Sequence, residues 1–289
     1  MTPGSPRRDE PLVKGEFLFT AEDFTRIARI LHGDSGIYMP ESKATLMYSR
    51  LAKRLRALGL KNFRDYCELV SQESEMDERR AMMAALTTNV TRFFREGHHF
   101  EDLRDTLMPG LAERARAGGR VRLWSAGCSN GAEPYSIAMT VLGVLPDAND
   151  LDVKILASDI DPNIVNEART GEYRADLMES IPREYRRYAE PVSETTWRMS
   201  DDTRALIAFR ELNLFSPWPF KGSFDAIFCR NVAIYFEESA QEQLWERFGE
   251  RMKPDSRLYI GHSERIRSRK FSNCGLTAYR HDAGGAAHV

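Results

Sequence analysis

The sequence predicts an α/β fold with a doubly wound, mostly parallel sheet, preceded by an all-helical N-terminal domain and interrupted by a small inserted subdomain. Apolar residues recur at helical spacing up to about residue 88, whereas from Arg120 short apolar runs alternate with helical segments. Strands that alternate with helices form parallel sheets covered on both faces. The segment 172–209 breaks the alternation because isolated aromatic residues lie among charges, and we expect a short antiparallel sheet there.

Four helices are expected in the N-terminal domain. The first begins at the capping pair Thr20 and Asp23 and is closed by Gly33. Apolar residues at intervals of three and four positions predict the other three, at about 42–58, from Asn62 onward and at 77–86. Because each helix has an apolar face, the four can pack together as a small helical domain.

Strands and helices alternate in the second domain. The expected strands are short apolar runs at 121–126, 153–159, 224–230 and 257–262. The expected helices are 134–145, a segment opened by Pro162, and about 239–252, which is followed by a turn at 253–255. The segment 277–280 is expected to be a terminal edge strand.

These expectations divide the chain into five regions. They are a disordered lead (1–16), a helical domain (17–88), a linker with a helix (89–119), the α/β domain with its insert at about 172–209 (120–281), and a flexible tail (282–289). The lead lacks the apolar region that an export signal requires, so we expect a cytoplasmic protein.

The composition excludes several classes of protein. The hydrophobic content of 42% and the charged content of 29% are ordinary for a soluble protein, and no apolar run is long enough to span a bilayer. The net charge of -2 excludes a globally basic nucleic-acid binder. The four cysteines form no C-x-x-C pair, and the adjacent side chains of His98 and His99 diverge by about 100° on a helix. We therefore expect no metal site.

A turn of small residues follows the first predicted strand, where ligands bind in sheets of this kind. Gly127 and Gly131 bracket the turn, and Glu133 lies at the entrance of the helix that follows. A carboxylate at this entrance disfavours a phosphate ligand and suits a cationic ammonium group. The pattern therefore favours a nucleoside cofactor that carries an ammonium group.

Polar residues end two further strands. Asp159 can accept hydrogen bonds from ribose hydroxyls or can cap the next helix, but Asp161 directly precedes Pro162 and is the better candidate for the cap. Arg230 and Asn231 end an otherwise apolar strand, either beside the ligand or with the arginine in a surface ion pair.

The predicted second helix carries a basic stripe beside its apolar face. The stripe consists of Lys43, Arg50 and Arg54, and it continues around the helix to Lys53 and Arg56. Such a stripe is commonly a solvated face, although its concentration in one helix of a mildly acidic chain also fits an acidic partner.

Several strings in fixed order resemble the chemotaxis receptor methyltransferases of the CheR family. They are LTTNVTRFFREGHHF (86–100), EPYSIA (133–138), ASDID (157–161), FDAIFCRNVAIYF (224–236) and GHSE (261–264), within a match over about 17–280. The resemblance implies a class I, Rossmann-like methyltransferase dependent on S-adenosylmethionine. It also implies the reaction, in which a receptor glutamate becomes a glutamate 5-O-methyl ester and S-adenosylhomocysteine is released.

The resemblance further implies the site residues. The cofactor contacts fall on Asn89, Thr91, Arg95, Glu133, Asp159, Asn213, Leu214, Arg230 and Asn231. Arg95 and Tyr235 are the implied catalytic residues, with Tyr235 near the reacting methyl. Arg95 orients the carboxylate of either the cofactor or the acceptor, and we favour the cofactor. The basic stripe would receive the acidic methylation helix in the cytoplasmic domain of a receptor.

Two departures from the family pattern leave alternatives open. Ala132 stands where family members often have an acid, which keeps a non-catalytic signalling module that binds S-adenosylmethionine or S-adenosylhomocysteine as the alternative function. The insert lacks a glycine-rich turn found in members that bind a receptor tether pentapeptide, so we expect independence of such a tether. A nucleic-acid methyltransferase is disfavoured by the charge and by the absence of an Asn-Pro-Pro-Tyr element.

Overall fold

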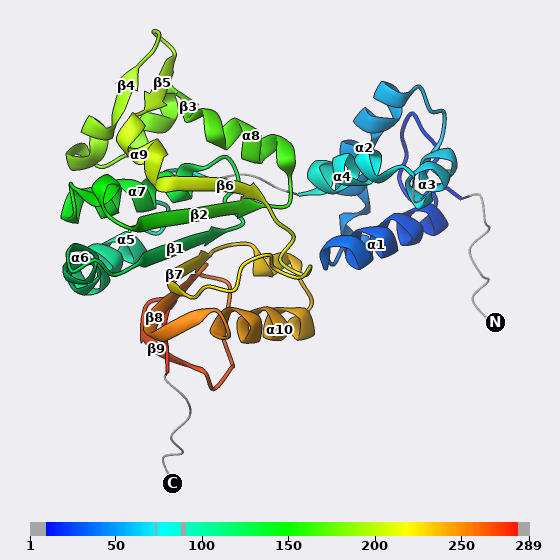
Figure 1. Cartoon of the computed structure of the whole chain (residues 1–289). Helices are drawn as coiled ribbons and strands as arrows, with labels where there is room; N and C mark the ends of the chain where they lie inside the picture. The colour runs from blue at the N-terminus through cyan, green and yellow to red at the C-terminus, as the bar shows by residue number, and fades with distance from the viewer. Residues whose placement is uncertain (1–9, 73, 88–90, 283–289) are drawn as a thin grey trace. The chain divides into compact units, whose positions relative to one another are not determined.

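The computed structural model describes residues 10–72, 74–87 and 91–282, and the chain divides into two compact units (Figure 1). The first unit comprises Met1–Thr88 together with Tyr235–Glu237, and the second comprises Asn89–Ile234 and Glu238–Val289. The sequence did not indicate that three residues after the strand at 224–230 belong to the helical unit.

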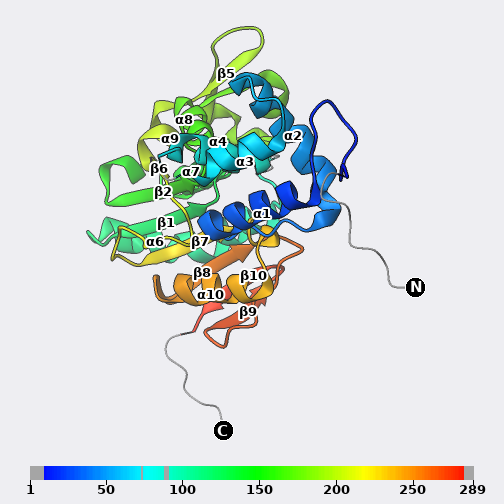
Figure 2. The same ribbon diagram turned by 90° about the vertical axis from the view of Figure 1, so that its right-hand side faces the viewer.

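The helical unit contains the four expected helices within its described residues (Figure 2). They are α1 (Ala21–Ser35), α2 (Ala44–Leu58), α3 (Phe63–Ser71) and α4 (Met76–Leu86), and a short 3-10 turn (Glu41–Lys43) precedes α2. Thr20 and Asp23 form the expected capping box, in which the Thr20 side chain accepts from the Asp23 N–H at 3.2 Å. The core includes Phe19 and Phe63, whose ring centroids are 4.4 Å apart.

The predicted end of the first helix was wrong. Gly33 lies inside α1, which continues to Ser35 and ends at Gly36. Gly36 has a φ of 72°, a left-handed conformation that glycine adopts without steric cost, and its N–H donates to His32 O at 2.8 Å. The signal for the helix end was therefore the second glycine in the segment and not the first.

The second unit is built on a mostly parallel sheet, as the sequence predicts. Within the described residues its strand order is β6-β2-β1-β7-β8-β10-β9. The strands are β1 (Val121–Ala126), β2 (Val153–Asp159), β6 (Ile207–Glu211), β7 (Phe224–Cys229), β8 (Met252–Ile260), β9 (Phe271–Gly275) and β10 (Ala278–His281). The first five strands in this order, β6, β2, β1, β7 and β8, run parallel to one another. β10 is antiparallel to both β8 and β9.

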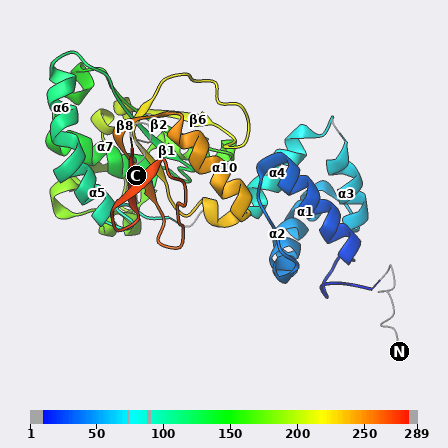
Figure 3. The ribbon, with the colours of Figure 1, turned by 90° about the horizontal axis from the view of Figure 1, so that it is seen from below.

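Helices pack on both faces of this sheet (Figure 3). The helices of the unit are α5 (His98–Asp102), continued by a π-helical turn (Leu103–Leu107), α6 (Met108–Arg116), α7 (Ala132–Val144), α8 (Pro162–Thr170), α9 (Asp201–Leu206) and α10 (Glu238–Gly249). Figure 3 shows α6 and α7 on one side of the strands and α10 on the other.

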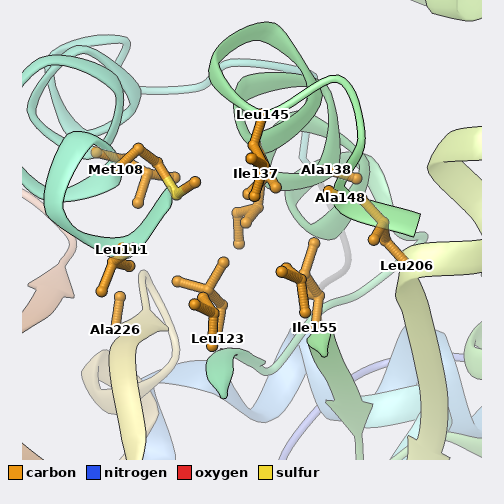
Figure 4. Close-up of a cluster of buried hydrophobic side chains, with 14 of the residues drawn as sticks. Met108, Leu111, Leu123, Ile137, Ala138, Leu145, Ala148, Ile155, Leu206 and Ala226 are labelled. Atoms are coloured by element: carbon orange, nitrogen blue, oxygen red, sulfur yellow. The ribbon is translucent and has the colours of Figure 1, made fainter. Parts of the chain in front are cut away.

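Alternation along β1 connects the sheet to both layers. Leu123 belongs to the apolar cluster formed with α6 and α7, where Figure 4 shows Met108 and Ile137 lying over it. The next residue, Trp124, points to the opposite face, as successive residues of a strand do. Its ring centroid is 5.2 Å from that of Phe248 in α10 and 4.9 Å from that of Trp218. The side chains of Leu123 and Trp124 are both fully buried, so β1 is packed on both of its faces.

The inserted subdomain is confirmed as a small antiparallel sheet. Its described strands are β3 (Glu172–Arg174), β4 (Ala189–Pro191) and β5 (Thr196–Met199), in the order β3-β5-β4. The predicted insert extended too far, because β6 pairs with β2 in the main sheet. Strand β6 was missed because its sequence, IAFRE, ends in charged residues and gives only a short apolar signal.

Two further expectations near the C-terminal part are corrected. The strand expected at 277–280 is β10, and it is not an edge strand because it lies between β8 and β9. The edge strand is β9, which was not predicted because its sequence, FSNCG, is polar. β8 begins at Met252 and includes the expected turn at 253–255, where Asp255 has a φ of 61° and the register with β7 shifts. Among the described residues no helix combines the length and apolar character needed to cross a bilayer.

Candidate functional site

The carboxyl ends of β1, β2, β7 and β8 meet at one edge of the sheet because these strands are parallel. At this edge open α/β sheets bind ligands. The segments that follow the four strands supply the glycine turn at 127–131, Asp159, the turn that begins at Arg230, and the segment 261–264. The structure thus gathers side chains that lie far apart in the sequence.

The turn after β1 requires both of its glycines. Gly127 has a φ of 84°, and a Cβ there would lie 2.4 Å from a methyl group of Val232. Gly131 has a φ of 90°, and a Cβ there would lie 2.8 Å from the Tyr173 hydroxyl and 2.9 Å from Ala168. A left-handed backbone and a close approach both exclude larger residues.

Asp159 fixes this turn from the end of β2. Its Oδ2 accepts from the Ser129 N–H at 2.8 Å, and its Oδ1 accepts from the Asp161 N–H at 3.1 Å. Burial raises the pKa of Asp159, although the backbone N–H groups act in the opposite direction. Asp161 is confirmed as the helix cap, because its side chain accepts from the Asn163 N–H at 2.9 Å. Asp159 is therefore not the helix cap, and both of its oxygens accept from backbone N–H groups.

A buried ion network lies beside this turn and is centred on Arg230. Its side chain is only 2% exposed, and its Nη1 donates to Glu133 Oε2 at 3.0 Å. Its Nη2 donates to Glu96 Oε2 at 3.2 Å and also to the Arg95 carbonyl. The other oxygen of Glu133 accepts from the Ser125 hydroxyl at 2.7 Å. Arg230 is therefore in a buried network and not in the surface ion pair that the sequence had left open.

The two carboxylates of this network differ in their electrostatics. Burial raises the pKa of Glu133 against the opposing influence of Arg230. Burial acts in the same direction on Glu96, but the charge of Arg230 and a hydrogen bond from His262 outweigh it and lower the pKa of Glu96. When the three groups are ionised, the network carries one more negative than positive charge. Such a site stabilises a cationic ligand.

Polar atoms without partners also occur at this edge. The Oδ1 atom of Asn231 and the Nε atom of Arg230 are buried and have no hydrogen-bond partner among the residues that the structure describes. Asn231 has a φ of 59°, a left-handed conformation that asparagine tolerates better than most residues. Buried polar groups are normally satisfied, so an unpaired amide oxygen here fits a ligand that brings a donor.

The remaining implied cofactor residues lie in the same unit. Thr91 and Arg95 are partly buried, whereas Asn89 lies outside the described residues. At the end of β6, Asn213 Oδ1 accepts from the Phe215 N–H at 2.9 Å, and Leu214 is buried. Because Leu212 N–H donates to Asp159 O at 2.8 Å, this segment is tied to the end of β2.

The two adjacent histidines pack within the protein. His99 is fully buried, and its Nε2 lies 2.9 Å from Thr277 Oγ1 and 3.2 Å from Leu276 O. Burial lowers the pKa of His99 to about 3, so its ring is neutral near pH 7. No cluster of side chains suited to a metal ion occurs in the described part of the chain.

Tyr235 and the basic stripe belong to the helical unit. The Tyr235 carbonyl accepts from the Tyr38 N–H at 2.8 Å, and Lys43 Nζ lies 5.8 Å from the centre of the Tyr235 ring. Arg50 donates to the carbonyls of Leu86 and Thr87 at the end of α4, at 2.9 and 2.7 Å.

The other residues of the stripe differ in their partners. Arg54 forms an ion pair with the buried Glu78, which also accepts from the Tyr66 hydroxyl at 2.9 Å. Arg56 pairs with Glu16 at 2.7 Å. Lys43 and Lys53 have exposed side chains. Part of the stripe thus stabilises the unit, whereas Lys43, Lys53 and Arg56 are exposed.

Sequence reasoning missed the roles of two carboxylates. Glu96 and Glu264 both lie inside recognised strings, FFREGHHF and GHSE, but no local pattern identifies their partners. Glu96 contacts Arg230, and Glu264 accepts from backbone N–H groups of the turn after β7.

The chain is similar to known proteins over most of its length. The family described as "CheR methyltransferase, SAM binding domain" matches residues 89–280, and "CheR methyltransferase, all-alpha domain" matches residues 22–87. The probable chemotaxis protein methyltransferase of Rhizobium etli is 49% identical over 263 residues, which cover 89% of this chain and 98% of that protein.

Two further curated proteins match over a similar length. The chemotaxis protein methyltransferase of Escherichia coli is 39% identical over 264 residues, covering 89% of this chain and 89% of that protein. Chemotaxis protein methyltransferase 2 of Pseudomonas aeruginosa is 41% identical over 273 residues, covering 91% of this chain and 94% of that protein. These names agree with an enzyme, and none of them favours the non-catalytic alternative.

Proposed function

The chain belongs to the CheR methyltransferase family, and we propose that it transfers a methyl group from S-adenosylmethionine to glutamate carboxylates of chemotaxis receptors. It is a methyltransferase dependent on S-adenosylmethionine. The observation that carries the proposal is the match of both family domains, which together extend from residue 22 to residue 280.

The carboxyl edge of the sheet has the chemistry that this cofactor needs. S-Adenosylmethionine supplies, when bound, an electrophilic methyl group on a positively charged sulfur. When Glu96 and Glu133 are both ionised, the Arg230 network carries an excess negative charge that favours such a cation. The unpaired Oδ1 of Asn231 can accept a hydrogen bond from it. In this proposal the buried carboxylate of Asp159 accepts from ribose hydroxyls. We assign cofactor contacts to these residues together with Asn89, Thr91, Arg95, Asn213 and Leu214.

The acceptor requires no deprotonation by the protein. An exposed glutamate has a pKa of about 4.3 and is therefore an anion near pH 7. The contribution of the protein is then to align the two reactants and to exclude water, and alignment alone supplies on the order of 7–11 kcal/mol in favourable cases. In this proposal Tyr235 lies near the transferred methyl group.

Arg95 is proposed to hold the carboxylate of the cofactor. A tight ion pair with the acceptor would reduce the nucleophilicity of its carboxylate, so binding to the cofactor is the better use of this charge. Arg95→Ala should then weaken the binding of S-adenosylhomocysteine in calorimetry. Unchanged affinity with lost turnover would instead assign Arg95 to the acceptor.

The helical unit is proposed to bind the acidic methylation helix of the receptor's cytoplasmic domain. Its exposed lysines are Lys43, in the turn before α2, and Lys53, in α2. They provide positive charge, and Arg50, Arg54 and Arg56 of α2 add to the field. We further propose that binding needs no receptor tether pentapeptide and that the protein acts in the cytoplasm. Calorimetric binding of a tether pentapeptide would contradict the former proposal.

One labelling experiment tests the reaction. The protein is incubated with S-adenosylmethionine labelled in its methyl group and with receptor-bearing membranes, and the product is treated with alkali. A carboxyl ester releases labelled methanol, whereas an N-methyl group remains on the product. Label that alkali does not release would contradict ester formation, and the absence of label would favour a non-catalytic binding module.

A further inference from the structure

Glu264 is a buried carboxylate that the reaction does not explain. The residue follows β8 and is only 2% exposed. Its Oε1 accepts from the N–H groups of Val232 and Ile234, at 3.0 and 3.3 Å. Its Oε2 accepts from the Asn231 N–H at 3.0 Å and from the Gly261 N–H. A backbone N–H of Ala233 also donates to this carboxylate, and among the described residues its partners are backbone donors and no cation.

The turn that Glu264 binds has a backbone conformation that it would not favour without outside contacts. Asn231 has a φ of 59°, which costs a residue with a side chain more than it costs glycine. A Cβ at Gly261 would lie 2.8 Å from the Asn231 N atom, so glycine is needed for the backbone of 261 to approach the turn. The N–H groups of Asn231, Val232 and Ile234 all donate to this one carboxylate, and together they can hold such a conformation.

The same turn carries the groups assigned to the cofactor. Arg230 immediately precedes it, and Asn231 is its first residue, with the buried Oδ1 that lacks a partner among the described residues. The Arg230 side chain is anchored independently by Glu96 and Glu133. The orientation of Asn231, in contrast, depends on the backbone that Glu264 binds.

We propose that Glu264 is a positioning residue of the cofactor site, which holds the turn from Asn231 to Ile234 so that the Asn231 side chain is aimed at the bound cofactor. This inference rests on the proposed assignment of Asn231 to the cofactor. Glu264 itself touches neither the cofactor nor the acceptor in this proposal, and its effect is transmitted through the backbone N–H groups.

A second buried carboxylate provides matched controls. Asp225 lies at the opposite, amino end of β7 and is also 2% exposed. It accepts from the Arg122 N–H at 2.8 Å and forms ion pairs with Arg114 and, at 2.9 Å, with Lys253. Loss of Asp225 should destabilise the same strand without reaching the cofactor edge. Glu264→Ala and Glu264→Gln are therefore compared with Asp225→Ala and Asp225→Asn.

The readouts are the Kd for S-adenosylhomocysteine by calorimetry, the KM for S-adenosylmethionine, and the thermal midpoint. We expect Glu264→Ala to raise the Kd by about tenfold and Glu264→Gln by about fivefold, with the KM rising in parallel and kcat changing less. The Asp225 variants should lower the thermal midpoint and leave the Kd within about twofold of the native value. Glu264→Gln preserves the side-chain volume, so this variant tests the positioning role if Glu264→Ala does not fold.

The outcomes separate this inference from the proposed function. Native affinity in the folded Glu264 variants overturns the positioning role, and so does an equal loss of affinity in the Glu264 and Asp225 variants, because it would reflect stability alone. If the native protein itself fails to bind S-adenosylhomocysteine, the proposed function falls and this inference falls with it.

Discussion

Arg230 and Glu133 form a buried ion pair, in which Nη1 of the arginine lies 3.0 Å from Oε2 of the glutamate although 97 positions separate the two residues. The pair joins the end of β7 to the first turn of α7, and Glu96 extends it. This carboxyl edge of the sheet is therefore held by charges that are removed from solvent.

Removal of the arginine should destabilise the protein. Arg230→Gln leaves Glu96 and Glu133 buried without their cation, and breaking a buried ion pair costs about 3–5 kcal/mol. Urea denaturation of the native and variant proteins measures this difference in the free energy of unfolding. The double variant Arg230→Gln, Glu96→Gln should recover part of the loss, because it removes one of the unpaired charges. Equal stability of the single variant and the native protein would contradict the importance of the network.

The stability of the native protein should fall on acidification as Glu96 is protonated. The pKa of Glu96 is lower in the folded than in the unfolded chain, so its ionised form stabilises the fold above the unfolded pKa and this contribution is lost as the pH falls through the folded pKa. Glu96→Gln should therefore be less stable than the native protein at pH 7, and the difference should shrink towards acidic pH. Glu101→Gln, at an exposed position of α5, is the control.

Two glycine variants separate backbone strain from steric clash. Gly127→Ala combines a φ of 84° with a Cβ only 2.4 Å from Val232, whereas Gly118→Ala has a φ of 81° and nothing within 4 Å of the added Cβ. We expect the first to cost about 3 kcal/mol or more and the second about 1 kcal/mol. Thermal unfolding measures both. Only Gly127→Ala should also weaken the binding of S-adenosylhomocysteine.

Charge reversal at the exposed lysines of α2 and of the 3-10 turn before it should distinguish partner binding from folding. Lys43→Glu with Lys53→Glu changes exposed residues, so receptor methylation should decrease while the thermal midpoint and cofactor affinity stay near the native values. Arg54→Glu is a contrasting variant, because it places a second carboxylate beside the buried Glu78 and should cost about 2 kcal/mol or more of stability. Unaltered receptor methylation in the double lysine variant would argue against α2 as the receptor-binding surface.

The sequence predicted those parts of the fold that have strong local signals. The strands at 121–126 and 153–159 and the helix start at Thr20 were predicted because apolar runs and capping residues are local. Strands β6 and β9 were missed, since their polar and charged residues become strand-forming only through the neighbours with which they pair.

The candidate site shows the same limit. Parallel topology explains why Asp159 and Arg230 lie at one edge of the sheet, so their placement at that edge was predictable. The ion pair between Arg230 and Glu96 was not predictable. It depends on the left-handed backbone of Glu96, whose φ is 56°, in a segment without regular structure. Glu264 acts on a turn about thirty positions earlier, a distance over which no sequence pattern applies.

The packing around Trp124 makes intrinsic tryptophan fluorescence a reporter of unfolding. All four tryptophans, Trp124, Trp197, Trp218 and Trp245, lie in the α/β unit, and the helical unit has none. Trp124 and Trp245 are buried beside Phe248 in α10, so opening of that layer exposes their indole rings to water. Intrinsic indole fluorescence therefore follows the melting of one unit alone, whereas circular dichroism follows both, and a mismatch between the two signals would reveal whether the units unfold separately.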